Sequence, residues 1–239
     1  MNTDKLSDRL ATVAKYVPEQ ARMADIGSDH AYLPCYLAKN GRITFAVAGE
    51  VAQGPYQSAE RNVLSEGLAE MISVRMGDGL EVIKPGEVDC ITIAGMGGAL
   101  ISSILENGKE KLSTVKRLVL QPNLSAISIR KWLIKNNWEL VAEEIIEEDE
   151  KIYEVLIAGQ GDAAKPYQKN RDWGLLLGPF LVQQKADAFK KKWTAEKNNW
   201  QRIYDALEDA TETEETLNKR QELLYKMKIV EEALVSEDS

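Results

Sequence analysis

Short apolar runs alternate with amphipathic segments over the first two-thirds of the chain, and this alternation predicts strands and helices in turn. Strands are expected at 23–26, 43–48, 72–76, 88–94 and 118–120. Helices are expected at 6–17, ending before Pro18, and at 32–39, 56–64, 100–105 and 127–135. Strands that are apolar on both faces and separated by helices are typical of a parallel sheet covered by helices.

Two further β-like runs follow the last of these helices, at 138–146 and 153–158. The acidic segment between them is too short for the crossover that parallel strands need, so this pair must form an antiparallel hairpin. The predicted fold class is therefore α/β: a Rossmann-like sheet of five parallel strands with a terminal antiparallel hairpin.

The pattern changes beyond Lys165, where β-like runs disappear and helical spacing takes over. We expect two domains, 1–161 and 162–239, divided at the turn-rich stretch 159–162. The second domain is predicted to be a coiled-coil-like hairpin of two long helices joined at about 211–214, with Thr213 capping the second. Its apolar seam is expected at Phe189, Trp193, Trp200, Ile203, Leu207 and Ala210 in one helix and at Leu217, Leu224, Met227 and Leu234 in the other.

Composition argues against a membrane-spanning, secreted or disulfide-rich protein. The 239 residues include 38 acidic and 30 basic side chains, a net charge of −8. No stretch approaches the roughly 18 consecutive apolar residues of a membrane span, and the polar N-terminus is unlike a signal peptide. Two cysteines, Cys35 and Cys90, provide neither a disulfide framework nor a metal knuckle, so we expect no metal and two reduced, buried thiols in a cytoplasmic protein.

Small and acidic residues gather where the predicted strands end. The segment 24–31, Ala-Asp-Ile-Gly-Ser-Asp-His-Ala, lacks the G-x-G-x-x-G spacing of a dinucleotide site. The carboxylate of Asp29 would repel a pyrophosphate at the next helix, so a cationic ligand without phosphates fits better than NAD or FAD. Glu50 lies 23 residues beyond Gly27, near the spacing at which an acidic side chain accepts the hydroxyls of an adenosine ribose.

Three more motifs follow later strands. Asp78, between Gly77 and Gly79, suits an adenine amino group; 94–98 is glycine-rich; and Gln121-Pro122-Asn123 supplies two amides. Taken alone, each motif also fits an ordinary turn or a solvated strand-end carboxylate. Because the carboxyl ends of parallel strands meet at one edge of a sheet, their concurrence predicts a single ligand site.

The strings Asp-Ile-Gly-Ser-Asp-His-Ala-Tyr-Leu-Pro, Ile-Ala-Gly-Met-Gly-Gly and Gln-Pro-Asn resemble class I S-adenosylmethionine-dependent methyltransferases, and most closely the bacterial TrmK family, which methylates N1 of adenine 22 in tRNA. The resemblance covers essentially the whole chain. It departs from the general class at Asp29 and Ala31, where glycine is usual, and in lacking the Asp/Asn-Pro-Pro-Tyr/Phe string. It implies that S-adenosylmethionine is bound by Asp25, Gly27, Ser28, Asp29, Glu50, Val51, Gly77, Asp78, Gly79, Ala94, Gly95, Met96 and Gly97.

Candidate catalytic residues follow from the chemistry that the resemblance implies. The N1 atom of neutral adenine already has a lone pair, so methyl transfer needs positioning and electrostatics more than a strong base. Asp29 is the candidate for stabilising the cationic product, with a contact to the cofactor as its alternative. His30, the single histidine, could hold the base or accept a proton, or could be a packed structural residue. Asn123 could hydrogen-bond the adenine edge.

Two basic clusters are the expected tRNA contacts, in spite of the acidic total. One is Arg130, Lys131 and Lys135; the other is Lys190, Lys191 and Lys192, within a stretch 185–202 that carries a charge of +4. The stretch 205–215 carries −6. Trp193 and Trp200 are interpreted as packing residues in preference to base-stacking ones, and Arg9 as a surface residue in preference to a site residue.

Two other functions remain open at this point. One is a small-molecule methyltransferase whose helical extension serves for dimerisation, and the other is a non-catalytic RNA-binding or scaffold protein. The sequence slightly favours a monomer without deciding the oligomeric state, and it does not identify the tRNA substrates, the way in which the target base is exposed, or a general base.

Overall fold

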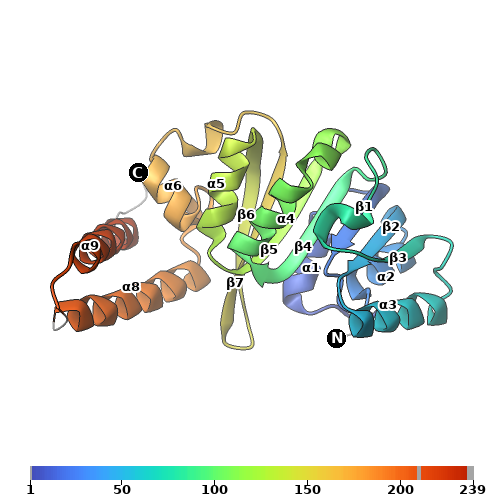
Figure 1. Ribbon diagram of the computed structural model, residues 1–239, viewed down its shortest axis with the longest axis horizontal. Helices are drawn as coiled ribbons and strands as arrows, with labels where there is room; N and C mark the ends of the chain where they lie inside the picture. Colours follow the sequence, from blue (N-terminus) through green and yellow to red (C-terminus); the bar gives the residue numbers. More distant parts are fainter. Residues whose placement is uncertain (1, 209–210, 236–239) are drawn as a thin grey trace. The chain divides into compact units, whose positions relative to one another are not determined.

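The computed structural model describes residues 2–208 and 211–235, which divide into two compact units with a boundary between Lys165 and Pro166. Figure 1 shows their helices and strands. The strands of the first unit are β1 (Ala21–Ile26), β2 (Ile43–Glu50), β3 (Ile72–Met76), β4 (Cys90–Gly97), β5 (Arg117–Leu124), β6 (Trp138–Glu148) and β7 (Lys151–Gln160). Its helices are α1 (Asp8–Lys15), α2 (Tyr32–Lys39), α3 (Gln53–Ser65), η1 (Gly79–Val82), α4 (Gly98–Asn107), η2 (Lys109–Thr114) and α5 (Ala126–Lys135).

All seven strands form one sheet in the order β3-β2-β1-β4-β5-β7-β6. The pairs among β1 to β5 are parallel, whereas β7 pairs antiparallel with both β5 and β6. The predicted class I methyltransferase sheet with its terminal hairpin is thereby confirmed. The predicted helices are also present, and their ends differ from the predicted ones by at most three residues.

The strand order places a switch point between β1 and β4. From β1 the chain runs outward through β2 and β3, then returns to β4 on the other side of β1 and continues to β5. Since crossovers are right-handed, the helices of these two halves cover opposite faces of the sheet. The chain therefore leaves β1 and β4 in different directions, which forms a crevice at the carboxyl ends of these two strands.

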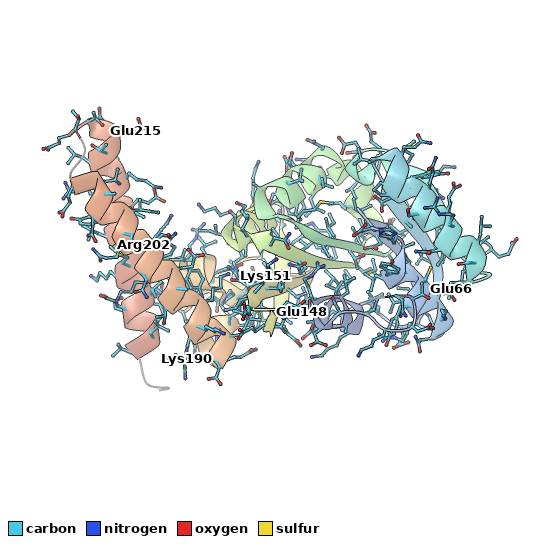
Figure 2. All side chains as sticks on the ribbon, turned by 90° about the horizontal axis from the view of Figure 1, so that it is seen from below. Glu66, Glu148, Lys151, Lys190, Arg202 and Glu215 are labelled. Carbon is cyan, nitrogen blue, oxygen red and sulfur yellow. The ribbon has the colours of Figure 1, made fainter. Side chains whose placement is uncertain are left out.

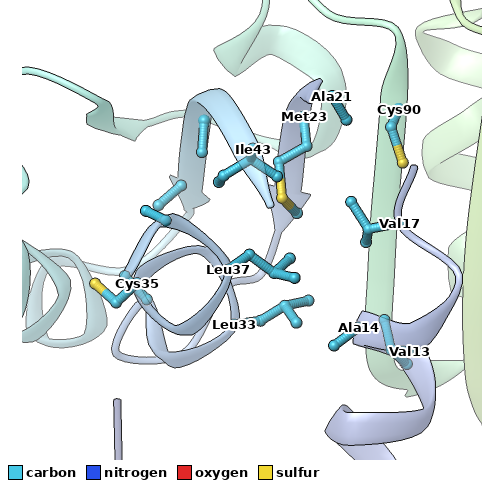
Figure 3. Close-up of a cluster of buried hydrophobic side chains, with 14 of the residues drawn as sticks. Val13, Ala14, Val17, Ala21, Met23, Leu33, Cys35, Leu37, Ile43 and Cys90 are labelled. Atoms are coloured by element: carbon cyan, nitrogen blue, oxygen red, sulfur yellow. The ribbon is translucent and has the colours of Figure 1, made fainter. Parts of the chain in front are cut away.

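Packing of α1 and α2 against the sheet fixes the strand ends on one side of this crevice. Figure 3 shows the core cluster in which Val13 and Val17 from the α1 region meet Leu33 and Leu37 of α2 over Met23 of β1. All five side chains are buried. The two cysteines are buried and unpaired as expected, and burial raises the pKa of Cys35 to about 11, so that thiol is unreactive.

The second unit is helical. It comprises α6 (Arg171–Leu177), α7 (Leu181–Gln184), α8 (Asp187–Glu208) and α9 (Glu214–Val235), preceded by η3 (Lys165–Tyr167). Contacts between Lys197 and Glu231 and between Glu208 and Arg220 show that α8 and α9 are antiparallel. Thr213 caps α9 as predicted, because its Oγ1 accepts the N–H of Thr216 at 3.1 Å.

The predicted seam of the helix pair is wrong in part. Ile203, Leu217 and Leu224 are exposed, whereas Met227 is buried as predicted. Beside Met227, α9 buries residues that were not predicted: Leu223, Ile229, Val230 and Ala233. Phe189 and Trp193 are buried in α8, which confirms that Trp193 packs in the core of its unit. Ala210 lies outside the described residues.

Candidate functional site

Asp25, near the end of β1, is a buried carboxylate beside the switch point. Its Oδ2 accepts a hydrogen bond from Ser28 Oγ at 2.6 Å, and its Oδ1 accepts one from Thr92 Oγ1 of β4 at 2.5 Å. Burial raises the pKa of Asp25, and the two hydroxyl donors oppose that rise. Among the described residues no cationic side chain pairs with Asp25, so the site is suited to a ligand that brings a positive charge.

The loop after β1 turns sharply through left-handed backbone conformations. Gly27 has φ +68°, and Asp29, His30 and Ala31 follow with φ values of +40°, +67° and +57°. Such a conformation costs a non-glycine residue on the order of 1–2 kcal/mol. A Cβ atom at Gly27 would lie 2.2 Å from Met96 Cε, so the glycine also makes room for the Met96 side chain at the end of β4. Strain of this kind is concentrated at functional loops.

Glu50 connects three of the predicted motifs. Its side chain is buried at the end of β2, where Oε1 accepts the backbone N–H of Asp29 at 2.5 Å. Its backbone carbonyl accepts the N–H of Gly77 at 2.9 Å, after β3. Burial raises the pKa of Glu50, and the hydrogen bond from the Asp29 N–H opposes that rise only in part. Oε2 accepts no hydrogen bond from the described residues and remains able to accept ligand hydroxyls.

Most of the predicted site residues line one of two cavities. The first, of about 280 Å³, is lined by Arg9, Leu10, Asp25, Gly27, Ser28, Asp29, Leu33, Ala94, Gly95, Met96, Asn123 and Tyr153. The second, of about 380 Å³, lies between η1 and α4 and includes Asp78 and Gly79. Glu50 and Gly77 join the strand ends through the hydrogen bonds described above. Val51 is exposed, and Gly97 precedes α4.

His30 lines neither of these two cavities. Its ring stacks on Tyr32 with centroids 5.2 Å apart, and its Nε2 lies 3.4 Å from Asp29 Oδ1. The backbone carbonyl of His30 accepts a hydrogen bond from Asn62 Nδ2 at 2.8 Å. These contacts hold the strained loop and favour the structural interpretation of this histidine.

Arg9 and Tyr153 are site residues that the sequence interpretation missed. Arg9 was expected on the surface, but it lines the first cavity, and its Nη1 donates to Gln121 Oε1 at 2.6 Å. Its guanidinium lies 5.4 Å from the centroid of the Tyr153 ring. The alternation of side chains along β7 gave no sign of this role for Tyr153, because half-buried aromatic residues are common in strands.

The expected tRNA contact at Arg130 is wrong. Arg130 is completely buried, and its guanidinium pairs with Glu143 of β6 and Glu154 of β7. Arg130 therefore links α5 to the β6–β7 hairpin through these ion pairs, and it cannot contact a phosphate because it is not accessible from the surface. Lys131 and Lys135, of the same cluster, are exposed.

The other basic cluster lies on α8, where Lys190 and Lys191 are exposed and Lys192 is half-buried. Figure 2 shows Lys190 and Arg202 along α8 and Glu215 at the start of α9. The basic stretch and the acidic junction therefore occupy different ends of the helix pair, which keeps a positive surface within an acidic protein.

Among residues 2–208 and 211–235, no three His, Cys, Asp or Glu side chains gather closely enough to hold a metal ion. No helix within the described segments is long and apolar enough to cross a membrane.

Comparison with known proteins agrees with this arrangement. The sequence model of the family described as "TrmK: tRNA (adenine(22)-N(1))-methyltransferase" matches residues 23–232. The tRNA (adenine(22)-N(1))-methyltransferase of Bacillus subtilis is 53% identical over 235 residues, which are 98% of this chain and 99% of the relative.

Solved structures extend the likeness to three dimensions. The crystal structure of the B. subtilis m1A22 tRNA methyltransferase TrmK matches with a TM-score of 0.94 and 52% identity, over 97% of this chain and 99% of that one. A Streptococcus pneumoniae protein in complex with S-adenosyl-L-methionine matches with a TM-score of 0.85 and 42% identity, over 96% and 100% of the two chains. The chain described here belongs to the TrmK family of tRNA (adenine(22)-N(1))-methyltransferases.

Proposed function

We propose that this protein transfers the methyl group of S-adenosylmethionine to N1 of adenine 22 in tRNA. The observation that carries the proposal is the convergence of Asp25, residues 27–29 of the strained loop, Gly95 and Asn123 on one cavity at the switch point of the sheet. Membership of the TrmK family and the similarity to a structure that holds S-adenosyl-L-methionine support it.

The residues at the switch point fit this cofactor. Asp25 supplies a buried negative charge that no side chain among the described residues neutralises, and the cofactor is cationic at its sulfonium and ammonium groups. Glu50 has a carboxylate oxygen available for the ribose hydroxyls. Asp78 is exposed beside Gly79, where a carboxylate can accept from the adenine amino group. Gly27 and Gly95 leave room for a ligand in the first cavity, since each has a positive φ and no side chain.

When bound, S-adenosylmethionine supplies an electrophilic methyl group on sulfur. Asn123, which lies near the end of β5 and lines the same cavity, would hold the edge of the target adenine so that N1 points toward the methyl carbon. Asp29 would stabilise the positive charge that develops on the base, since this residue lines the same cavity. We assign His30 the supporting role of holding the loop that carries Asp29.

The helical unit is proposed to contribute to tRNA binding through Lys190, Lys191 and Lys192, and the methyltransferase unit through Lys131 and Lys135. Reversing the three charges on α8 (K190E/K191E/K192E) should weaken tRNA binding and flatten its salt dependence while leaving cofactor affinity unchanged. A matched triple reversal on α9, K219E/K226E/K228E, changes the net charge by the same amount and serves as the control. Equal loss in both variants, or no loss in the first, would exclude this surface as the tRNA contact.

The decisive experiment incubates the purified protein with methyl-labelled S-adenosylmethionine and unmodified tRNA and maps the label by nuclease digestion. We expect one labelled N1-methyladenosine per tRNA. In the cell, we propose that the protein acts in the cytoplasm, where tRNA and cofactor meet. Label on small metabolites alone would support the small-molecule alternative, and cofactor binding without transfer would support the non-catalytic one. D25A and E50A should each weaken cofactor binding in calorimetry by at least about 10-fold, the size expected for a lost charge-assisted hydrogen bond.

A further inference from the structure

Arg9 is held in the site by contacts from three separate elements. The backbone N–H groups of Asp8 and Arg9, at the start of α1, donate to Glu148 Oε1 at the end of β6. The Arg9 guanidinium stacks over Tyr153 of β7 and donates to Gln121 of β5. Figure 2 labels Glu148 at the hairpin turn that supplies the first of these contacts. These contacts fix both the backbone and the side chain of Arg9, which is unusual for an arginine that only faces solvent.

Gln121 receives two donors on one side of its amide. It is fully buried, and its Oε1 accepts from Arg9 Nη1 at 2.6 Å and from the backbone N–H of Gly95 at 3.0 Å. Two donors can face only the carbonyl oxygen of an amide, so the orientation of the Gln121 amide is determined. Its Nε2 is consequently directed toward the carbonyl oxygen of Pro122, at 2.9 Å, and toward Asn123 Oδ1, at 3.5 Å.

The orientation of Gln121 is passed on to Asn123. Asn123 Nδ2 donates to the carbonyl oxygen of Gly95 at 2.8 Å, and its Oδ1 faces Gln121 Nε2. Both ends of the Asn123 amide are therefore defined by partners that Gln121 and Gly95 present. Asn123 is exposed, so Oδ1 retains a lone pair for a ligand in the cavity.

We propose that Arg9 is a positioning residue for the target base: through Gln121 it fixes the amide of Asn123 with its carbonyl oxygen available to the adenine amino group. This inference rests on the proposed function. With the amide reversed, an NH₂ group would oppose the NH₂ group of adenine, and the base would lose its holding contact.

The hydrogen bond between Asn123 Oδ1 and the adenine amino group matters most during the reaction. As the N1 lone pair forms the new bond to the methyl carbon, the carbon–sulfur bond breaks and its electron pair stays on sulfur. The positive charge that appears on adenine spreads to its amino group, so the hydrogen bond to Asn123 Oδ1 becomes stronger in the transition state. Loss of the orientation should therefore lower kcat, with little change in the KM for S-adenosylmethionine.

The test compares R9A, Q121E and N123A in steady-state methylation of tRNA. R9A removes the first donor. Q121E keeps an acceptor for Arg9 and Gly95 but offers no donor to Asn123. It therefore removes the hydrogen bond to Asn123 while keeping the one from Arg9. We expect each to lower kcat by about 10-fold or more, the effect of one hydrogen bond lost in the transition state. K15M, at the other end of α1, is the matched control and should leave kcat unchanged.

A double-mutant cycle separates this role from its competitors. Without the Asn123 amide there is nothing to orient, so R9A should cost less than about 2-fold in an N123A background. If Arg9 instead contacts a tRNA phosphate, R9A raises the KM for tRNA, reduces its salt dependence and adds fully to N123A. That result, or a full kcat in Q121E with an unchanged melting temperature, would overturn the inference. Failure of the wild-type protein to methylate tRNA would instead refute the proposed function.

Discussion

Replacing Arg130 with methionine tests the buried ion cluster that joins α5 to the β6–β7 hairpin. Methionine keeps much of the apolar stem but removes the guanidinium that faces Glu143 and Glu154. All three side chains are almost completely buried. R130M would thus remove the cation that both carboxylates contact, at a site where all three side chains are almost completely buried.

The structure sets the size of the effect. Removing one partner of a buried ion pair costs about 3–5 kcal/mol, because the remaining charge is left uncompensated. For a unit of this size, each kcal/mol lowers the melting temperature by roughly 2–4 °C, so R130M should melt on the order of 10 °C below the wild type. K131M, a change to the exposed neighbouring side chain, should stay within about 0.5 kcal/mol.

Urea unfolding followed by circular dichroism measures both variants, and tRNA affinity is measured below their melting temperatures. R130M should lose stability and retain tRNA affinity. The triple variant R130M/E143L/E154L should recover most of the loss, because an apolar cluster can replace buried charges without penalty. A fully stable R130M protein with weakened tRNA binding would refute the buried placement and restore Arg130 as a tRNA contact.

Two further predictions concern a glycine pair and an acid-sensitive ion pair. A Cβ atom at Gly98 would lie 2.2 Å from the backbone oxygen of Ser125, whereas one at Gly97 would meet nothing closer than 4.0 Å, so G98A should lower the melting temperature well below that of G97A; equal melting would contradict this packing. Arg75 lowers the pKa of Glu87 to about 2. The stability from this pair should be complete above pH 4.5 and lost as the pH falls toward 2, and E87Q should remove that part of an acid titration followed by circular dichroism; identical acid profiles would contradict it.

The sheet was predictable because its signal is local. Apolar runs marked every strand, and the short acidic connection at 147–151 left the hairpin as the sole arrangement for the last two. The strand ends carried the acidic and glycine-rich residues that now surround the first cavity. The predicted seam of α9 placed Leu217 and Leu224 in the interior, but packing within the unit buries Leu223 and Val230, which recur at the same spacing.

The remaining features depend on residues that are distant in the sequence. Arg130 stands beside Lys131 and has the appearance of a surface cation; its partners are 13 and 24 residues away, and only the fold brings them beneath α5. Arg9 meets Gln121 across 112 residues. Neither pairing leaves a local pattern, because the spacing along the chain reflects sheet order and not helical or strand periodicity.

The central claim is that methyl transfer to adenine 22 takes place in the cavity between β1, β4 and β5. The most direct test is primer extension on tRNA treated with the protein and S-adenosylmethionine, since a methyl group on N1 blocks base pairing and stops the polymerase. The wild-type protein should produce a stop next to position 22, and neither a tRNA with guanine at position 22 nor the D25A protein should give one. A stop at another position, or an undiminished stop with D25A, would contradict the account.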